Sequence, residues 1–117
     1  MMRPGDEVAV LLCREPVDFR KAINGLSILV EQELGLDLFS PRIFAFTNRK
    51  KDRVKLLYWD RTGFALWLKR LEKARFPWPE EGEAIVSFTG RELNWLLDGI
   101  DFFRLEPHES LSYDSVL

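Results

Sequence analysis

Residues 52–69 have the sequence DRVKLLYWDRTGFALWLK, in which two apolar runs flank a short polar turn. The first run, Val54–Trp59, is rich in the aliphatic and aromatic residues that are typical of strands. Asp60-Arg61-Thr62-Gly63 places Asp at the first position of a turn and Gly where a positive φ is easiest. We therefore expect Phe64–Lys69 to return antiparallel to Val54–Trp59.

A helix is the competing interpretation of the second run. Phe64, Leu68 and Leu71 recur at helical spacing, and residues 66–73 are good helix formers. The sequence leaves open whether residues 64–75 form a strand or a helix.

Three further strands are expected outside this hairpin. Val8–Cys13 is an apolar run that ends before a proline, and Ile43–Phe46 precedes the polar tip Thr47–Arg53. Ala84–Phe88 follows the acidic link Glu80–Glu83 and has the same strand character.

One helix is predicted over about Phe19–Leu34, with Asp18 as its N-cap and Gly35 at its C-terminal end. The dipeptide Asn24-Gly25 favours a hairpin instead, but the residues around it do not alternate. They keep helical spacing at Ala22, Ile23, Leu26, Leu29, Val30 and Leu34. We expect the helix to form, at some cost from its internal glycine.

A second helix is predicted to begin at Thr89. Glu92 stands three positions later, which is the spacing of a capping box. Gly99 lies near the expected end of this helix. Its predicted buried stripe consists of Leu93, Leu96, Leu97 and Ile100.

Together these elements predict an α+β fold, a small, mostly antiparallel sheet of about four to five strands with two amphipathic helices packed on it. Residues 1–105 are expected to form one domain and the polar residues 106–117 a disordered tail. Cys13 is expected to be a buried hydrophobe, and it cannot form an internal disulfide because it is the chain's single cysteine. No apolar run approaches the ~20 residues needed to span a bilayer, and no secretory signal is visible, so we expect a cytoplasmic protein.

The charges of the chain are segregated by position. Residues 1–41 carry four basic and seven acidic side chains, residues 42–75 eleven and three, and residues 76–117 two and nine. The local charges are therefore −3, +8 and −7, and they add to the net −2 of the whole chain. Only the middle third has the basic character of a nucleic-acid-binding segment.

Basic side chains in this middle third fall into two groups, which we treat as candidate nucleic-acid-binding residues. Aromatic residues interleave with them, as in proteins that neutralise phosphates and stack on bases. The alternative is that the cations are the solvated face of half-buried strands, with most of the aromatics in the core. The candidates are Arg49, Lys50, Lys51, Arg53, Lys55, Lys69, Arg70, Lys73 and Arg75.

Catalytic chemistry finds little support in the sequence. Phosphate-loop, dinucleotide-binding and nucleophile-elbow motifs are absent, and the single histidine, His108, lies in the expected tail. Asp52, Asp60 and Glu72 are the only acids of the basic third, and two of them occupy predicted turns, where Asp is common for backbone reasons. We therefore expect no enzyme activity, no metal and no cofactor.

Several runs resemble the TnpB-type accessory protein of bacterial insertion sequences of the sixty-six family. They are Val17-Asp18-Phe19-Arg20-Lys21 with Asn24-Gly25-Leu26, the stretch 52–60, Gly63-Phe64 with residues 68–76, and Phe76-Pro77-Trp78-Pro79 with residues 93–101. The match covers about residues 5–103 in register. This family is distinct from the much longer RNA-guided nuclease that shares the TnpB name.

The resemblance implies a small protein that is encoded beside a separate transposase, acts with it in transposition and has no established catalytic activity. It supplies no catalytic residue. Recurrent motif positions of the family fall here on Asp18, Arg20, Lys21, Gly25, Trp59, Asp60, Gly63, Phe76 and Pro79, together with several of the basic candidates and Leu71.

Three hypotheses follow from these observations. The first is an accessory factor that binds transposon DNA, with weak sequence specificity, through the basic middle third beside the transposase. The second is an adapter that docks on the transposase without contacting DNA, since opposed charged regions suit protein docking. The third and weakest is a metal-dependent enzyme that uses Asp60. The oligomeric state is not predicted.

Overall fold

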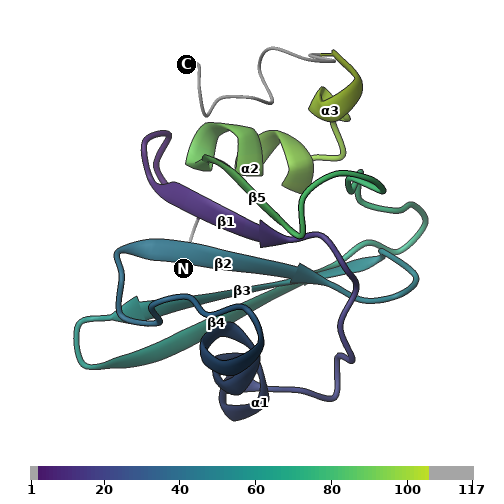
Figure 1. The fold of residues 1–117 in the computed structure, drawn as a ribbon. Coiled ribbons are helices and arrows are strands. Elements are labelled where there is room, and N and C mark those ends of the chain that lie inside the picture. Colours follow the sequence, from purple (N-terminus) through teal and green to yellow (C-terminus); the bar gives the residue numbers. More distant parts are fainter. Residues whose placement is uncertain (1–2, 106–117) are drawn as a thin grey trace.

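The computed structural model describes residues 3–105 of the 117-residue chain. Five strands form one sheet in the order β4-β3-β2-β1-β5 (Figure 1). Their bounds are β1 Ala9–Cys13, β2 Arg42–Thr47, β3 Arg53–Asp60, β4 Gly63–Arg70 and β5 Ile85–Thr89. The α+β class and the predicted strands are thus confirmed.

The sheet is mixed, which corrects the prediction of a mostly antiparallel sheet. β1 and β2 are parallel, whereas the pairs β1–β5, β2–β3 and β3–β4 are antiparallel. The chain between β1 and β2 carries a helix, and such a crossover connection lets two successive strands run in the same direction.

The β3–β4 hairpin forms as a strand pair along its full length, from Arg53 opposite Arg70 to Asp60 opposite Gly63. The helical alternative for residues 64–70 is therefore wrong. The positive φ of the turn lies at Arg61, at 58°, and not at Gly63 as expected. A two-residue loop between directly paired strands requires the left-handed conformation inside the loop.

The first helix is shorter than predicted. α1 spans Ile23–Ile28 and continues as the π-helical turn η1, Leu29–Glu33. Ala22 occupies the N-cap position without a side-chain cap, so Asp18 is not the N-cap. The residues before Ala22 instead form a turn that binds β3, as described below.

The second helix, α2, spans Gly90–Leu97 and begins with the predicted capping box of Thr89 and Glu92. Gly99 has a φ of 85° and turns the chain away after the helix. Ile100 therefore leaves the helical period and is 43% exposed, which corrects its predicted place in the buried stripe. A short helix, α3, follows at Phe102–Leu105.

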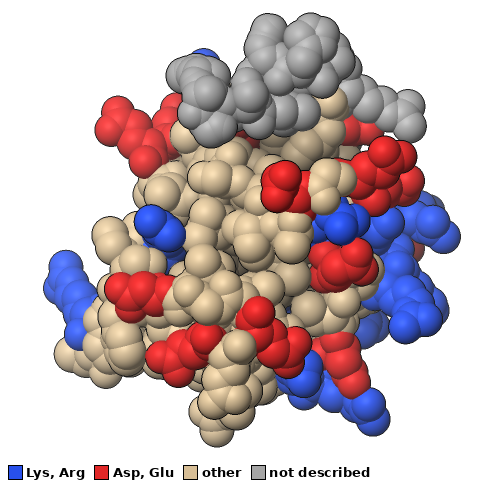
Figure 2. All heavy atoms as spheres, viewed as in Figure 1, with Lys and Arg blue, Asp and Glu red and all other residues tan. Residues whose placement is uncertain are grey.

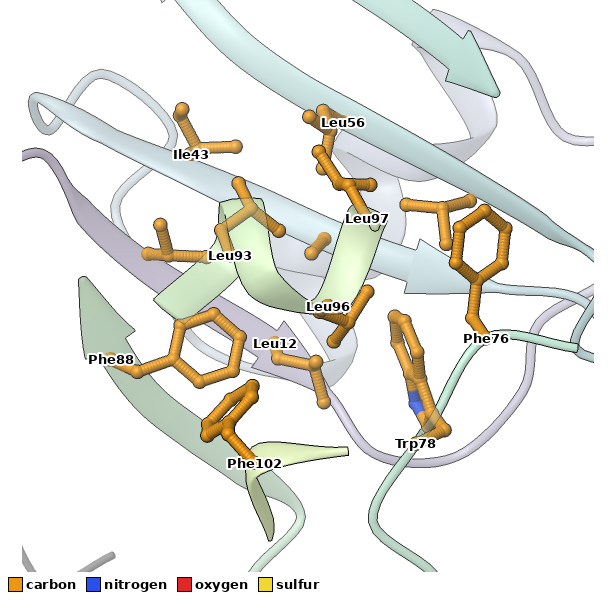
Figure 3. Close-up of a cluster of buried hydrophobic side chains, with 13 residues drawn as sticks. Leu12, Ile43, Leu56, Phe76, Trp78, Phe88, Leu93, Leu96, Leu97 and Phe102 are labelled. Carbon is orange, nitrogen blue, oxygen red and sulfur yellow. The ribbon is translucent and has the colours of Figure 1, made fainter. Parts of the chain in front are cut away.

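Each face of the sheet is covered by a helical layer (Figure 1). On one face, α1 and η1 bury Leu26, Leu29 and Val30 with Cys13, which confirms the buried cysteine. On the other face, α2 packs against β1, β2, β3 and β5 around Leu12 (Figure 3). The labelled residues of that cluster in Figure 3 include Ile43, Leu56, Phe76, Trp78, Phe88, Leu93, Leu96, Leu97 and Phe102.

No helix in residues 3–105 is long and apolar enough to cross a membrane. His108 and the predicted tail, residues 106–117, lie outside the described residues. The division into a domain over residues 1–105 and a tail therefore stays a prediction.

Candidate nucleic-acid interface

The turn between β2 and β3 is held by Asn48. Its side-chain Oδ1 accepts the backbone N–H groups of Asp52 and Arg53, each at 3.1 Å, and its Nδ2 donates to the Asp52 carboxylate at 2.6 Å. This hydrogen bond is the main cause of the lowered pKa of Asp52. Lys51 takes the left-handed conformation, with a φ of 61°. The turn thus presents its cations on a fixed backbone.

The segment after β4 returns to this turn. The backbone N–H of Leu71 donates to the Asp52 carbonyl at 2.8 Å, and that of Phe76 donates to the Lys51 carbonyl at 2.7 Å. The two predicted basic groups therefore meet at one end of the sheet, because β3 begins and β4 ends there.

We call this surface the basic end, and Figure 2 shows Lys and Arg gathered on that side of the molecule. Cations at the beginning of β2 and in the β3–β4 turn, Arg42 and Arg61, lie at the opposite end of the sheet. The basic end consists of Arg49, Lys50, Lys51, Arg53, Arg70, Lys73 and Arg75.

Acidic side chains offset only part of this charge. Among the described residues, ion pairs of the basic end join Lys51 to Glu80 at 3.8 Å and Arg70 to Glu72 at 3.1 Å. The acidic link therefore touches the basic end through Glu80 without covering it. Most of the cations remain directed to solvent, since Arg49, Lys50, Arg53, Lys73 and Arg75 are all exposed.

Two of the nine candidates, Lys55 and Lys69, bind the protein's own backbone. Lys55 is buried, and its Nζ donates to the carbonyls of Phe19 at 2.9 Å and Lys21 at 2.7 Å. Burial lowers the pKa of Lys55, and the nearby charge of Arg53 lowers it further. Lys69 Nζ donates to the carbonyl of Leu97, the last residue of α2, at 2.9 Å.

Lys69→Gln is expected to lower the free energy of unfolding by about 1 kcal/mol, because the variant loses the cation that binds the Leu97 carbonyl at the C-terminus of α2. Urea denaturation measures the change. Lys73→Gln is the matched control, because that side chain is exposed in the segment after β4. Equal midpoints for the two variants would contradict the structural role of Lys69.

A hollow of about 400 Å³ opens beside the basic end, on the α1 face of β3 and β4. Its floor is two cross-strand pairs, Arg53 opposite Arg70 and Lys55 opposite Leu68. Phe19 and Glu72 complete the lining. We call it the Arg53/Arg70 hollow.

A larger groove of about 740 Å³ lies next to this hollow, and the two share Phe19 and Arg53. It runs between the segment Glu15–Phe19 and the turn Asn48–Arg53. The backbone N–H of Val17 donates to the Thr47 carbonyl at 2.9 Å and joins the two walls. Cations and carboxylates both line this groove.

Sequence reasoning missed Phe19 and Leu68 as possible ligand contacts. The position of Leu68 beside the cations could have been derived from the expected hairpin, because a register that pairs Asp60 with Gly63 also pairs Lys55 with Leu68. The contact of Phe19 had no such signal, since it depends on the tertiary position of the segment before α1.

The family-motif residues before α1 build the turn that holds Lys55. The Asp18 carboxylate accepts the Arg20 backbone N–H at 2.9 Å and pairs with the Arg20 guanidinium at 2.6 Å. A Cβ on Gly25 would lie 3.0 Å from the Lys21 Cβ, so glycine permits the close approach of this turn to α1. These motif positions thus help to set the conformation of the turn before α1.

The Asp18 carboxyl is expected to titrate at about 2 rather than at its ordinary 3.8, because the Arg20 side chain and backbone bond its charged form and lower its pKa. A lowered pKa stabilises the fold above the ordinary value, and this contribution is lost as the pH falls from 3.8 towards about 2. NMR titration of the carboxyl carbon measures the midpoint, which Arg20→Gln should raise. A native midpoint near 3.8 would contradict the geometry.

The remaining motif positions divide between the two ends of the sheet. Asp60 and Gly63 close the β3–β4 turn, and Trp59 packs edge-on against Phe64 at a centroid distance of 5.0 Å. At the basic end, Phe76 is buried beneath the turn at Lys51. Pro79 lies beside it in the segment that leads to the acidic link.

The three acids of the basic third do not converge. Asp52 and Asp60 lie at opposite ends of β3, about 25 Å apart for a strand of this length. Glu72 pairs with Arg70. No group of three or more His, Cys, Asp or Glu side chains in residues 3–105 could hold a metal ion.

Fold and surface together define a small α+β protein with a cationic sheet end. The family model described as "IS66 Orf2 like protein", TnpB_IS66, matches residues 8–107. The chain therefore belongs to the IS66 Orf2-like family, which confirms the resemblance and makes it an accessory protein associated with insertion sequences.

Two relatives from Sinorhizobium fredii (strain NBRC 101917 / NGR234) are similar over most of their length. Uncharacterized protein y4jC is 32% identical over 106 residues, which cover 91% of each chain. Uncharacterized protein y4hO is 29% identical over 102 residues, which cover 87% of this chain and 89% of the relative. No solved structure matches the chain significantly.

Proposed function

We propose that this protein is a non-catalytic accessory factor of insertion-sequence transposition that binds transposon DNA through the basic end, beside a separate transposase. One observation carries the proposal: the turn Asn48–Arg53 and the segment after β4, which flank the β3–β4 hairpin, are hydrogen-bonded into one cationic surface. Like charges repel when they are brought together, so such a surface is most favourable when an anion neutralises it.

Phosphate is the anion that this surface fits. The exposed cations come from a turn, from the adjoining ends of β3 and β4 and from an irregular segment. Cations placed in this way suit contacts with a nucleic-acid backbone, which position a protein without reading base edges. Binding would then depend little on sequence and strongly on salt, because each neutralised phosphate releases counterions. Glu80 and Glu81 would repel phosphate and so keep DNA away from the acidic link Glu80–Glu83.

The salt dependence of DNA affinity tests the proposal. Fluorescence anisotropy of a labelled duplex and a labelled single strand is measured between 50 and 200 mM NaCl. The logarithm of affinity should fall linearly with the logarithm of salt, with a slope of about 0.9 for each duplex phosphate neutralised. Absence of binding to either DNA at 50 mM salt, or binding unchanged by salt, would refute the proposal.

A second candidate function is a protein adapter that docks on the transposase without contacting DNA. Phe39 favours it, because this side chain is 57% exposed and packs edge-on against Trp59 and at a tilt against Phe64, at the opposite end of the sheet from the basic end. An exposed aromatic group of this kind suits a protein partner better than phosphate. Co-purification of the two proteins after nuclease treatment, weakened by Phe39→Ser, would support this function.

A further inference from the structure

We propose that the Arg53/Arg70 hollow binds one nucleotide of single-stranded DNA, with its phosphate between the two arginines and its base over Leu68 and Phe19. The proposal rests on the proposed function and goes further, since it distinguishes an unpaired strand from a duplex. It assigns to one part of the basic end the binding of an unpaired nucleotide.

The arginine pair is the first observation behind this site. Arg53 and Arg70 are directly opposite on antiparallel strands, and both are exposed on the same face. Side chains in such a pair have Cβ atoms about 5 Å apart, and like charges there are destabilising. A phosphate between the two guanidiniums would replace this repulsion by two charge-assisted interactions.

Lys55 adds a third cation to the same hollow. It is buried beneath the surface, and its Nζ lies 4.7 Å from the centroid of the Phe19 ring. Within residues 3–105, neither Lys55 nor Arg53 forms an ion pair with a carboxylate. Arg70 pairs with Glu72 and Lys55 is bound to two backbone carbonyls, so Arg53 is the cation of the hollow that has neither kind of partner among the described residues.

Apolar surface beside the cations indicates the kind of nucleic acid. Leu68 is 55% exposed, pairs with Lys55 across the strands and shares the face of Arg70 two residues later. Phe19 forms the neighbouring wall. A duplex presents charged backbone and keeps its base faces stacked inside, whereas an unpaired base can cover an apolar side chain.

The dimensions and the rim of the hollow agree with one nucleotide. Its volume of about 400 Å³ lies in the lower part of the ~300–1,000 Å³ range of small-ligand sites. Glu72 is the sole acid in its lining and pairs with Arg70 at 3.1 Å. A bound phosphate would compete with this carboxylate for the guanidinium.

Binding of a labelled twelve-residue oligothymidylate and of a duplex of equal length, at the same salt, tests the proposal. We expect the native protein to bind the single strand more tightly. Leu68→Ser should weaken single-strand binding about fivefold and leave duplex binding unchanged. Glu72→Gln should strengthen single-strand binding, whereas Arg53→Gln should weaken it about tenfold.

Arg49→Gln is the matched control, because it removes a cation of the basic end that does not line the hollow. It should weaken the single strand and the duplex alike. Thermal melting of each variant verifies folding, and Leu68 is exposed enough to tolerate serine.

The outcomes separate this inference from the proposed function. Equal binding of single strand and duplex, or a Leu68→Ser variant that retains the native preference, would overturn the nucleotide site while DNA binding stands. If the native protein binds neither the single strand nor the duplex, both the nucleotide site and the proposed function are overturned.

Discussion

Replacing Arg49, Lys50 and Arg75 together with Gln is expected to weaken DNA binding about 100-fold at 0.1 M salt. All three side chains are exposed in the basic end. A phosphate contact made through counterion release contributes roughly tenfold to affinity at this salt, and the three need not all contact phosphate at once. The salt slope should also fall by about 0.9 for each phosphate that is no longer neutralised. Fluorescence anisotropy over a salt series measures both quantities.

The matched control replaces Arg42, Arg61 and Arg91 with Gln. It removes the same amount of positive charge from outside the basic end, since Arg42 and Arg61 lie at the opposite end of the sheet and Arg91 lies on α2. Only a modest loss of affinity is expected from the change in net charge. Equal losses of DNA affinity in the two triple variants would mean that binding depends on the net charge of the whole protein and not on the basic end.

Gly90→Ala is expected to destabilise the protein by about 3 kcal/mol, or to prevent stable folding. Gly90 is the first residue of α2, and a Cβ there would overlap the backbone carbonyl of Gly5. The backbone cannot simply move aside, because the Gly90 N–H donates to the Val8 carbonyl at 2.8 Å. The better helix propensity of alanine, worth up to about 1 kcal/mol, is too small to compensate.

Gly5→Ala is the matched control for this overlap. A Cβ on Gly5 meets nothing within 4 Å, so the same added methyl group should change stability little. Chemical denaturation of both variants gives the two free energies of unfolding. A Gly90→Ala variant as stable as Gly5→Ala would show that the N-terminal segment does not pack on α2 in this way.

Local chemistry explains which elements could be predicted from the sequence. The β3–β4 hairpin and the capping box of α2 depend on residues close in sequence, and both form as expected. The predicted strand–helix–strand order is compatible with the parallel pair β1–β2. Whether the two strands lie next to each other depends on where the crossover places β2. The late start of α1 has a similar cause, since Lys55 on β3 binds the carbonyls of Phe19 and Lys21.

Charge counting located the basic region but not the role of each cation in it. Lys55 and Lys69 belong to the same cationic run as Arg53 and Arg70, yet both bind backbone carbonyls. Alternation along β4 turns Lys69 to the α2 face, whereas Lys55 shares the face of Arg53 and is bound because the segment before α1 packs over it. Conversely, the pairing of Arg53 with Arg70 follows from the hairpin register. The β3–β4 register must therefore be known before the cations of a candidate site can be identified.

Chemical-shift mapping of the isotope-labelled protein with a short DNA oligonucleotide tests DNA binding by the basic end most directly. The backbone amide signals of residues 48–53 and 70–76 should move as DNA is added at low salt, while those of β5 and α2 should stay in place. Signals that do not move, or that move only in residues 85–97, would contradict a DNA-binding basic end.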